Sequence, residues 1–149
     1  MQKVAAGFLI FRRFTGIIEF LLLQTSYGEH HWTPPKGHTD PGETDLQAAY
    51  RETEEEAGFT KSDFKIFENE KYVLNYEVKG KPKVVYYWLA ELTNANANVK
   101  LSDEHQDFKW LSLKEACELC KYEDMIELLN KCQRVITEKY NKEENVSKI

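Results

Sequence analysis

The sequence predicts an α/β protein in which a mixed β-sheet is flanked by helices. Three observations support this class. The chain of 149 residues is long enough to bury one core. Segments rich in β-branched and aromatic residues occupy both the start and the middle of the chain. Segments with helical periodicity follow a long loop and also close the sequence. No repeat or linker divides the chain, so we expect a single domain over residues 1–149.

The N-terminal part is expected to form a β-hairpin followed by a functional loop. Residues 3–14 and 18–25 are largely apolar and are separated by a short turn, which is typical of paired strands. Residues 26–43 form a long loop rich in Gly, Pro and His. Because loops of this length in a compact domain are usually functional, we expect this segment to contribute to a site.

The remaining elements alternate less regularly. A helix is expected at about 45–57, where Thr44 to Gln47 fit a capping box and Gly58 provides a stop. Further strands are expected at 64–70, 72–79, 83–92 and 107–111, and further helices at 113–120 and 123–140. Residues 141–149 are expected to be a frayed tail.

Charge and cysteine content exclude several classes of protein. The net charge of −5 argues against a general nucleic-acid binder, which needs a broad basic surface. The three cysteines, Cys117, Cys120 and Cys132, form no disulfide-like framework, so we expect a reducing, cytoplasmic location. Cys117 and Cys120 lie in an apolar helical stripe and are expected to pack in the core. The sequence contains no targeting segment or membrane span, and a monomer is expected.

The helix at 45–57 has two distinct faces. Its apolar positions fall on one arc and define the expected buried side: Leu46, Ala49, Tyr50, Thr53 and Ala57. Glu52, Glu55 and Glu56 stand at i, i+3 and i+4, and we expect them to share a face away from that arc. Such a face is most often a solvated surface. Alternatively, the repulsion among three carboxylates is reversed by a divalent cation, since Mg²⁺ prefers oxygen ligands.

The spacing of the charged residues and glycines favours the metal interpretation. Seven identities follow the pattern G-x5-E-x7-R-E-x-x-E-E-x-G: Gly37, Glu43, Arg51, Glu52, Glu55, Glu56 and Gly58. Ordinary residue frequencies produce such a match by chance on the order of once in 10⁵ to 10⁶ chains of this length. The pattern resembles the Nudix box, the loop-helix-loop of hydrolases that cleave nucleoside diphosphates linked to another group. Thr53 departs from the resemblance, because the family generally has Ile, Leu or Val there.

Segments outside the box resemble one subfamily more specifically. The strings "HHWTPPKGH", "KPKVVYYWLAEL" and "LSDEHQDFKWLSLKEA" are similar to the animal-type, asymmetrically cleaving diadenosine tetraphosphate hydrolases, and the resemblance spans about residues 3–132. It implies the Nudix α/β/α sandwich and cleavage of a dinucleoside polyphosphate to ATP and AMP. It also implies dependence on Mg²⁺ or Mn²⁺, with more than one ion when substrate is bound.

The resemblance also implies a set of metal-binding and catalytic residues. The implied metal ligands are Glu52, Glu55, Glu56, Glu104 and the backbone carbonyl of Lys36. Catalytic roles fall to Glu56, Glu104 and Arg51. Either Glu56 or Glu104 accepts a proton from the attacking water, and the sequence leaves this choice open. Arg51, one turn before Glu55, can orient a glutamate.

Substrate-binding residues are expected in the loop and in the strand at 83–92. A tetraphosphate requires several cations and flat surfaces for its bases. Strand alternation places Lys83 and Tyr87 on one face, so both can reach one ligand, while Trp88 on the other face packs in the core. The residues expected to contact phosphate are His31, Lys36, His38, Lys81, Lys83 and Tyr87. Tyr76, expected to be exposed, and Tyr122 match the adenine-stacking aromatics of the subfamily, although Tyr122 fits a core edge equally well by sequence.

Other functions fit the same residues less completely. A Nudix pyrophosphohydrolase acting on a 5′-triphosphate RNA end, or on another dinucleoside polyphosphate, would share the box. A nucleotide-sensing module would keep the fold without turnover. Such modules usually lack one of the box glutamates, whereas this sequence contains all of them. A plain interaction domain requires the seven-residue match to be accidental.

Overall fold

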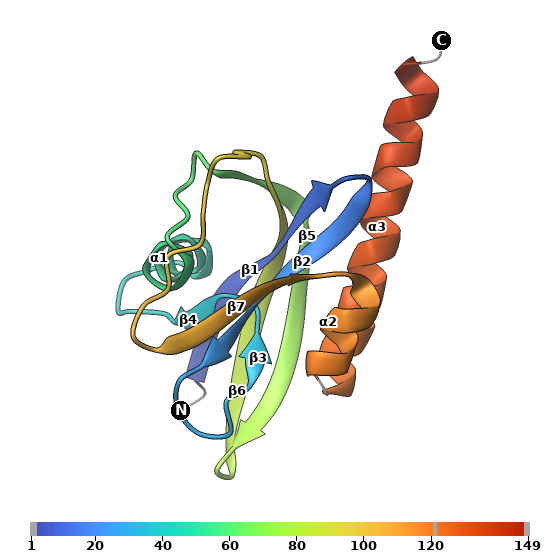
Figure 1. Cartoon of the computed structure of the whole chain (residues 1–149). Coiled ribbons are helices and arrows are strands. Elements are labelled where there is room, and N and C mark those ends of the chain that lie inside the picture. The colour runs from blue at the N-terminus through green and yellow to red at the C-terminus, as the bar shows by residue number, and fades with distance from the viewer. Residues whose placement is uncertain (1–2, 121, 148–149) are drawn as a thin grey trace.

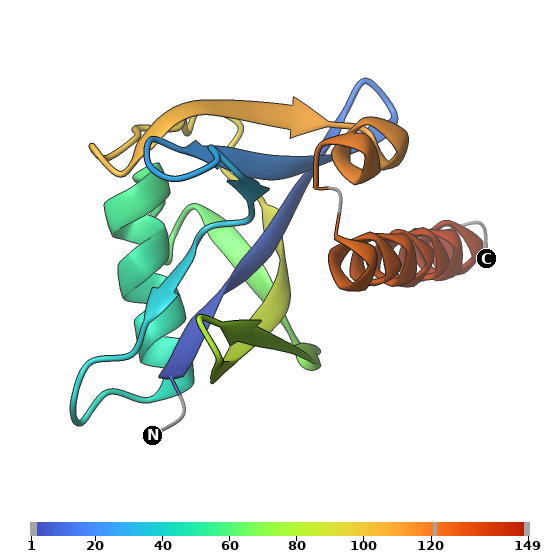
Figure 2. The same ribbon diagram turned by 90° about the horizontal axis from the view of Figure 1, so that it is seen from below.

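The structure, a computed structural model, describes residues 3–120 and 122–147. Its elements are β1 (Lys3–Phe14), β2 (Ile17–Thr25), β3 (Trp32–Thr33), β4 (Lys36–His38), α1 (Asp45–Ala57), β5 (Phe64–Val78), β6 (Lys81–Leu92), β7 (His105–Leu111), α2 (Leu113–Cys120) and α3 (Glu123–Ser147). Helix α1 covers one side of the sheet, and α2 and α3 cover the other (Figure 1; Figure 2). The expected α/β/α sandwich is therefore confirmed.

The sheet is mixed because its central strand has neighbours in both directions. The strand order is β3-β2-β1-β6-β5, while β4 pairs with β1 and β7 pairs with β2. Strands β1 and β6 are parallel over Lys3 to Phe11, and the other pairs are antiparallel. Along β1, the first half pairs with β4 and the second half with β2. The loop that carries β4 is thereby fixed against the centre of the sheet.

Alternation along β1 divides the buried side chains between two cores. Leu9 and Phe11 belong to the cluster on the α2 and α3 side. Phe8 and Ile10 belong to the cluster on the α1 side. Since successive residues of a strand point to opposite faces, a buried strand with apolar residues on both sides is expected in a three-layer fold.

Three expected boundaries differ from the structure. The loop at 26–43 contains the short strands β3 and β4. The separate strands expected at 64–70 and 72–79 form one strand, β5, with a register shift between Ile66 and Lys71 against β6. A β-bulge of this kind interrupts the alternation of apolar residues and makes one strand resemble two in sequence. The tail expected to fray from residue 141 continues α3 through Ser147, and residues 148–149 lie outside the described part.

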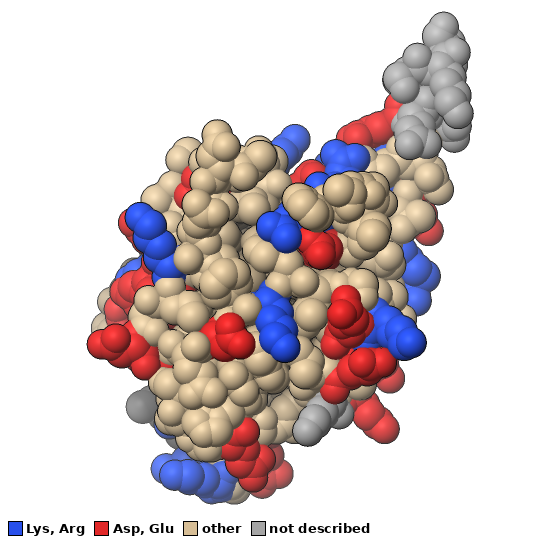
Figure 3. Space-filling model, viewed as in Figure 1, with Lys and Arg blue, Asp and Glu red and all other residues tan. Residues whose placement is uncertain are grey.

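The surface viewed in Figure 3 carries both signs of charge. Acidic and basic side chains are interspersed over this face, with no continuous basic area. In the described part of the chain, no helix combines the length and apolar character needed to cross a membrane.

Thr53 provides a test of how α1 packs. Its side chain is fully buried, and its hydroxyl oxygen has no hydrogen-bond partner among the described residues. A buried hydroxyl without a partner costs roughly 1–3 kcal/mol. We therefore expect Thr53→Val, which keeps the shape and removes the hydroxyl, to raise the free energy of unfolding by about 1 kcal/mol in urea denaturation.

Thr25 is the matched control for this substitution. Thr25 is also buried, but its hydroxyl donates to the carbonyl of Tyr27 at 3.1 Å. Thr25→Val should therefore lower the free energy of unfolding, because it leaves that carbonyl without its donor. A Thr53→Val variant less stable than wild type would show that the Thr53 hydroxyl has a partner that the structure lacks.

Candidate active site

Helix α1 is fixed at both ends by its own sequence. The Thr44 side chain accepts a hydrogen bond from Gln47 N, and the Gln47 side chain accepts one from Thr44 N, so the predicted capping box is confirmed. Gly58 ends the helix in the left-handed conformation with φ of 78° and donates to Glu54 O. Lys100 N donates to Ala57 O at 2.9 Å and satisfies another terminal carbonyl. These caps determine which residues of α1 face the β4 loop.

Glu56 is buried, contrary to the expectation that all three box glutamates lie away from the packed face. It is 5% exposed, and its Oε1 accepts a hydrogen bond from Lys36 N at 2.9 Å. The helical wheel failed here because β4 packs on the acidic side of α1. Burial raises the pKa of Glu56 to about 8; Glu52 and Glu104 act in the same direction, and the Lys36 contacts oppose them.

Glu52 lies against the backbone of Gly37, which explains the glycine of the box. A Cβ atom built at Gly37 would lie 2.0 Å from the carboxyl carbon of Glu52. Only glycine permits this approach of helix and loop. Burial raises the pKa of Glu52, although its contacts with Arg51 lower it in part.

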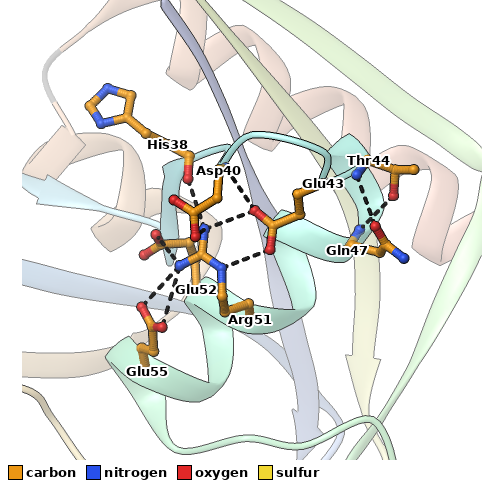
Figure 4. Close-up of polar contacts among 8 residues, drawn as sticks. All are labelled: His38, Asp40, Glu43, Thr44, Gln47, Arg51, Glu52 and Glu55. Atoms are coloured by element: carbon orange, nitrogen blue, oxygen red, sulfur yellow. Dashed lines mark hydrogen bonds and ion pairs between the residues drawn. The ribbon is translucent and has the colours of Figure 1, made fainter.

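The guanidinium of Arg51 organises the other carboxylates of the site (Figure 4). Its contacts are 2.8 Å from Nε to Glu43 Oε2, 2.9 Å from Nη1 to Glu52 Oε1, 3.2 Å from Nη1 to Glu55 Oε2, 3.4 Å from Nη2 to Asp40 Oδ2 and 2.9 Å from Nη2 to His38 O. All its nitrogens are therefore engaged by the protein, which makes Arg51 a positioning residue for the acids. The bidentate pair with Glu43 also fixes the loop to the helix.

The acids suit a divalent cation chemically, although the structure does not assemble a complete ligand cluster. Within residues 3–120 and 122–147, no group of three or more His, Cys, Asp or Glu side chains is placed to hold a metal ion. The reason is that Glu52 and Glu55 both contact Arg51. Glu56 nevertheless sits in a negative field, since Glu52 and Glu104 both raise its pKa. A hard cation would relieve this field, so the carboxylate set fits such an ion.

Glu104 approaches this group from the segment before β7. It is exposed, its backbone carbonyl accepts from Ser26 N at 2.9 Å, and its charge raises the pKa of both Glu52 and Glu56. The structure thus brings Glu104 into the field of the box glutamates, and its role as a metal ligand stays a prediction.

A cavity of about 590 Å³ opens beside Lys36 and lies between the β4 loop, β5, β6 and the α2–α3 junction. Of the predicted substrate-binding residues, six line it: His31, Lys36, Tyr76, Lys83, Tyr87 and Tyr122. Burial, followed by the charge of Lys36, lowers the pKa of Lys83 to about 8. The cavity therefore combines cations with aromatic side chains, and Tyr76 lies directly across the strand pair from Lys83.

The aromatic side chains differ in burial. Tyr122 is 50% exposed, which resolves the sequence alternatives in favour of a surface position, and its hydroxyl lies 3.4 Å from His31 Nδ1. Tyr76 was expected to be exposed but is half-buried, and burial raises its pKa to about 12. Tyr87 is 1% exposed and belongs to the core, so it forms the floor of the cavity rather than a free side chain. Trp88 is buried in the opposite core, as predicted.

Two predicted substrate residues lie outside the lining of this cavity. Lys81 borders a separate hollow of about 200 Å³, together with Lys3, Lys79 and Lys83. His38 is exposed, and its carbonyl is bound by Arg51. Sequence reasoning placed both by proximity in the chain, whereas Lys79 and Lys83, on either side of Lys81, do line the cavity.

Two side chains of the site were missed by sequence reasoning. Tyr27 lines the cavity and is 62% exposed, and the charges of Glu104 and Glu56 contribute to its raised pKa after burial. An aromatic residue within a long Gly/Pro/His loop was the available signal. His105 is buried, with Nε2 4.0 Å from Glu56 Oε2. Burial lowers its pKa, against the opposing charge of Glu104.

The fold and the acidic loop-helix define the class of protein. The NUDIX domain family matches residues 1–132, so the chain belongs to the Nudix hydrolase family. Members of this family generally need divalent metal ions.

The chain is also similar to particular members of this family. The asymmetrical bis(5′-nucleosyl)-tetraphosphatase of Caenorhabditis elegans is 56% identical over 131 residues, covering 88% of this chain and 94% of that protein. The protein of the same name from Mus musculus is 52% identical over 131 residues, covering 84% and 89%. A crystal structure of a C. elegans Ap4A hydrolase binary complex matches with a TM-score of 0.88 at 52% identity and covers 91% of this chain and 98% of that one.

The contacts of Arg51 predict how stability depends on pH. Arg51 lowers the pKa of Glu43 from 4.5 to about 2. A lowered carboxylate pKa in the folded state stabilises the protein above the ordinary value, and this contribution is lost as the pH falls towards the folded value. We expect Arg51→Met to lower the free energy of unfolding by about 1–3 kcal/mol at pH 6. The difference from wild type should shrink between about pH 4.5 and pH 2.

Chemical denaturation at a series of pH values measures this difference. Arg134→Met, at an exposed arginine of α3, is the matched control and should change stability little at any pH. A difference between wild type and Arg51→Met that stays constant down to pH 3 would contradict the role assigned to the Arg51–Glu43 pair.

Proposed function

We propose that this protein hydrolyses diadenosine tetraphosphate asymmetrically to ATP and AMP. The observation that carries the proposal is a cavity lined by lysines and tyrosines, one of whose lining residues, Lys36, binds the buried carboxylate of Glu56 through its backbone amide. Its extent suits a ligand with several phosphates and flat bases. Similarity to two animal enzymes named for asymmetrical bis(5′-nucleosyl)-tetraphosphatase activity supports the same substrate.

The cations of the cavity would hold the phosphate chain. Lys36 and Lys83 line the cavity at the acidic end, and His31 lines it further along the loop. Ammonium groups bind phosphate oxygens as point charges, and a phosphate chain would favour the charged form of Lys83 despite its lowered pKa. Lys81 and His38 lie outside the lining, so we assign them at most contacts with parts of the substrate that extend from the cavity.

Two tyrosines of the cavity would bind a nucleobase. Tyr76 and Tyr122 border the same cavity from β5 and from the segment before α3. Stacking of a base on an aromatic side chain is worth roughly 1–3 kcal/mol and requires no particular hydrogen bonds. One adenosine held there would fix the distance between the base and the acidic centre.

Divalent cations, Mg²⁺ or Mn²⁺, would be held by four carboxylates and one carbonyl: Glu52, Glu55, Glu56, Glu104 and the backbone oxygen of Lys36. More than one ion would be present when substrate is bound. Bound divalent cations neutralise charge on phosphoryl oxygens and lower the pKa of water. Arg51 keeps Glu52 and Glu55 in place. The Lys36 amide keeps one oxygen of Glu56 directed at the loop.

A carboxylate of the site would accept the proton of the attacking water. Glu56 suits this role, because it lies in the middle of the acidic group and Lys36 N holds its Oε1 at 2.9 Å, which fixes the direction of the carboxylate. Glu104 is the alternative, because it is exposed at the edge of the same acidic group. The attacked phosphorus would be the one that carries the 5′-oxygen of the adenosine released as AMP. The bridging P–O bond to the triphosphate arm would break, so that the water oxygen stays in AMP and the arm leaves as ATP.

The same considerations favour this substrate over the alternatives. A 5′-triphosphate RNA end would use the phosphate-binding lysines but would not need the aromatic pair of Tyr76 and Tyr122 for a second nucleoside. A nucleotide-sensing module is disfavoured because all glutamates of the box are present. We further propose that the chain is one domain over residues 1–149, that it is monomeric, and that it acts in the cytoplasm.

Product analysis in ¹⁸O-labelled water tests the proposal. With Mg²⁺ and diadenosine tetraphosphate, we expect ATP and AMP as the only nucleotide products. If water attacks the phosphorus of the leaving AMP unit, mass spectrometry should find the label in AMP and not in ATP. Glu56→Gln should lower the rate by orders of magnitude and provides the background measurement.

Two outcomes would contradict different parts of the proposal. Label on the γ-phosphate of ATP would overturn the position of attack and leave the substrate assignment intact. Two molecules of ADP as the main products would overturn asymmetrical cleavage.

A further inference from the structure

His105 is placed beside the buried carboxylate of Glu56 by an irregularity in strand β7. The register between β2 and β7 shifts between Gln24 and Thr25: Gln24 pairs with Asp107, whereas Thr25 pairs with His105. Gln106 is therefore the extra residue of a β-bulge. Bulges of this kind redirect side chains and are frequent near active sites.

The bulge determines which side of the sheet His105 faces. Leu21 and Leu23 belong to the core beneath α1, and Thr25 shares their face because side chains alternate along a strand. Residues paired across two strands share a face, so His105 opposite Thr25 also points towards α1. In a regular ladder, Gln106 would occupy this place. The start of β7 lies beside α1 in both ribbon views (Figure 1; Figure 2).

Among the described residues, Glu56 has the one acidic side chain within 4.0 Å of the imidazole nitrogens. His105 is 8% exposed, its Nε2 lies 4.0 Å from Glu56 Oε2, and its Nδ1 has no hydrogen-bond partner among the described residues. The other oxygen of Glu56 is bound by Lys36 N at 2.9 Å. At 4.0 Å the two groups are in contact but not hydrogen-bonded, and a neutral imidazole with its proton on Nε2 would form that bond after a small movement of either group.

We propose that His105 is a positioning residue for Glu56. Lys36 N fixes one carboxylate oxygen and His105 limits the movement of the other, so that the carboxyl group keeps one orientation towards the acidic centre. The proposal rests on the proposed function only in taking Glu56 as a working carboxylate of the site. A buried polar atom without a hydrogen-bond partner destabilises the fold, and Nδ1 of His105 is such an atom. Its presence is explained if the other nitrogen, Nε2, is needed beside Glu56.

Two substitutions separate positioning from packing. His105→Phe keeps a ring of similar size and removes both nitrogens. His105→Gln keeps a nitrogen donor at a reach comparable with Nε2. For hydrolysis of diadenosine tetraphosphate with Mg²⁺, we expect His105→Phe to lower kcat about 10- to 100-fold, as loss of a side chain that orients a metal-binding carboxylate typically does. KM should change less than about twofold, and His105→Gln should recover most of kcat.

Thermal unfolding provides a readout that does not depend on activity. Because His105→Phe removes a buried nitrogen that lacks a partner, its melting temperature should equal or exceed that of wild type. Gln106→Ala, at the exposed residue of the bulge, is the matched control and should keep the wild-type kcat. A His105→Phe variant that melts lower, loses kcat and is not rescued by Gln would establish a packing role and overturn the proposal.

A double-mutant cycle tests whether His105 acts through Glu56. In the Glu56→Gln background, His105→Phe should cost less than about twofold in kcat, because the carboxylate it positions is already gone. Equal losses in both backgrounds would overturn positioning through Glu56. Unchanged kcat in His105→Phe alone would refute this proposal but leave the proposed function standing, whereas unchanged kcat in Glu56→Gln would refute the assigned catalytic centre itself.

Discussion

The close packing of helix α1 against the β4 loop is the constraint on which the rest of the site depends. Gly37 leaves room for the carboxylate of Glu52, and the amide of Lys36 binds Glu56. Both contacts bring negative charge out of water and close to other negative charge. Bringing these carboxylates together without a bound cation costs free energy. The caps of α1 and the guanidinium of Arg51 hold them in place nevertheless. The loop therefore positions the acids and is itself held by them.

Two groups of carboxylates result, with opposite electrostatic properties. Glu43 is bound by Arg51, which lowers its pKa to about 2, so it is charged at neutral pH. Glu56 is buried next to other acids, which raises its pKa to about 8. Environments that push the pKa values of neighbouring acids apart are typical of sites that use one acid structurally and another chemically. The cavity beside Lys36 extends this centre towards the aromatic side chains that would bind the rest of a long substrate.

Local patterns in the sequence predicted the parts of the fold that local interactions determine. Helix-end chemistry predicted the capping box at Thr44 and the end of α1 at Gly58, and the structure contains both. Strand alternation predicted that Lys83 and Trp88 lie on opposite faces of β6, and they do. Burial of Glu56 could not be predicted from the helical wheel, because a segment 20 residues earlier covers that face. The orientation of His105 depends on a β-bulge, which changes the side of the sheet that each following side chain faces. The residue types around His105 do not reveal this bulge. Metal ligation and the substrate roles of the lining residues remain predictions.

Hydrolysis of diadenosine tetraphosphate by Gly37→Ala tests the central claim most directly. The added Cβ would lie 2.0 Å from the carboxyl carbon of Glu52, so α1 and the loop must separate or Glu52 must turn away. We predict that kcat falls by at least about 100-fold while the protein still folds. Gly42→Ala, which also strains the box loop but meets no atom within 4 Å, should keep a kcat within about threefold of wild type. Wild-type kcat in Gly37→Ala would show that catalysis does not depend on this approach of helix and loop.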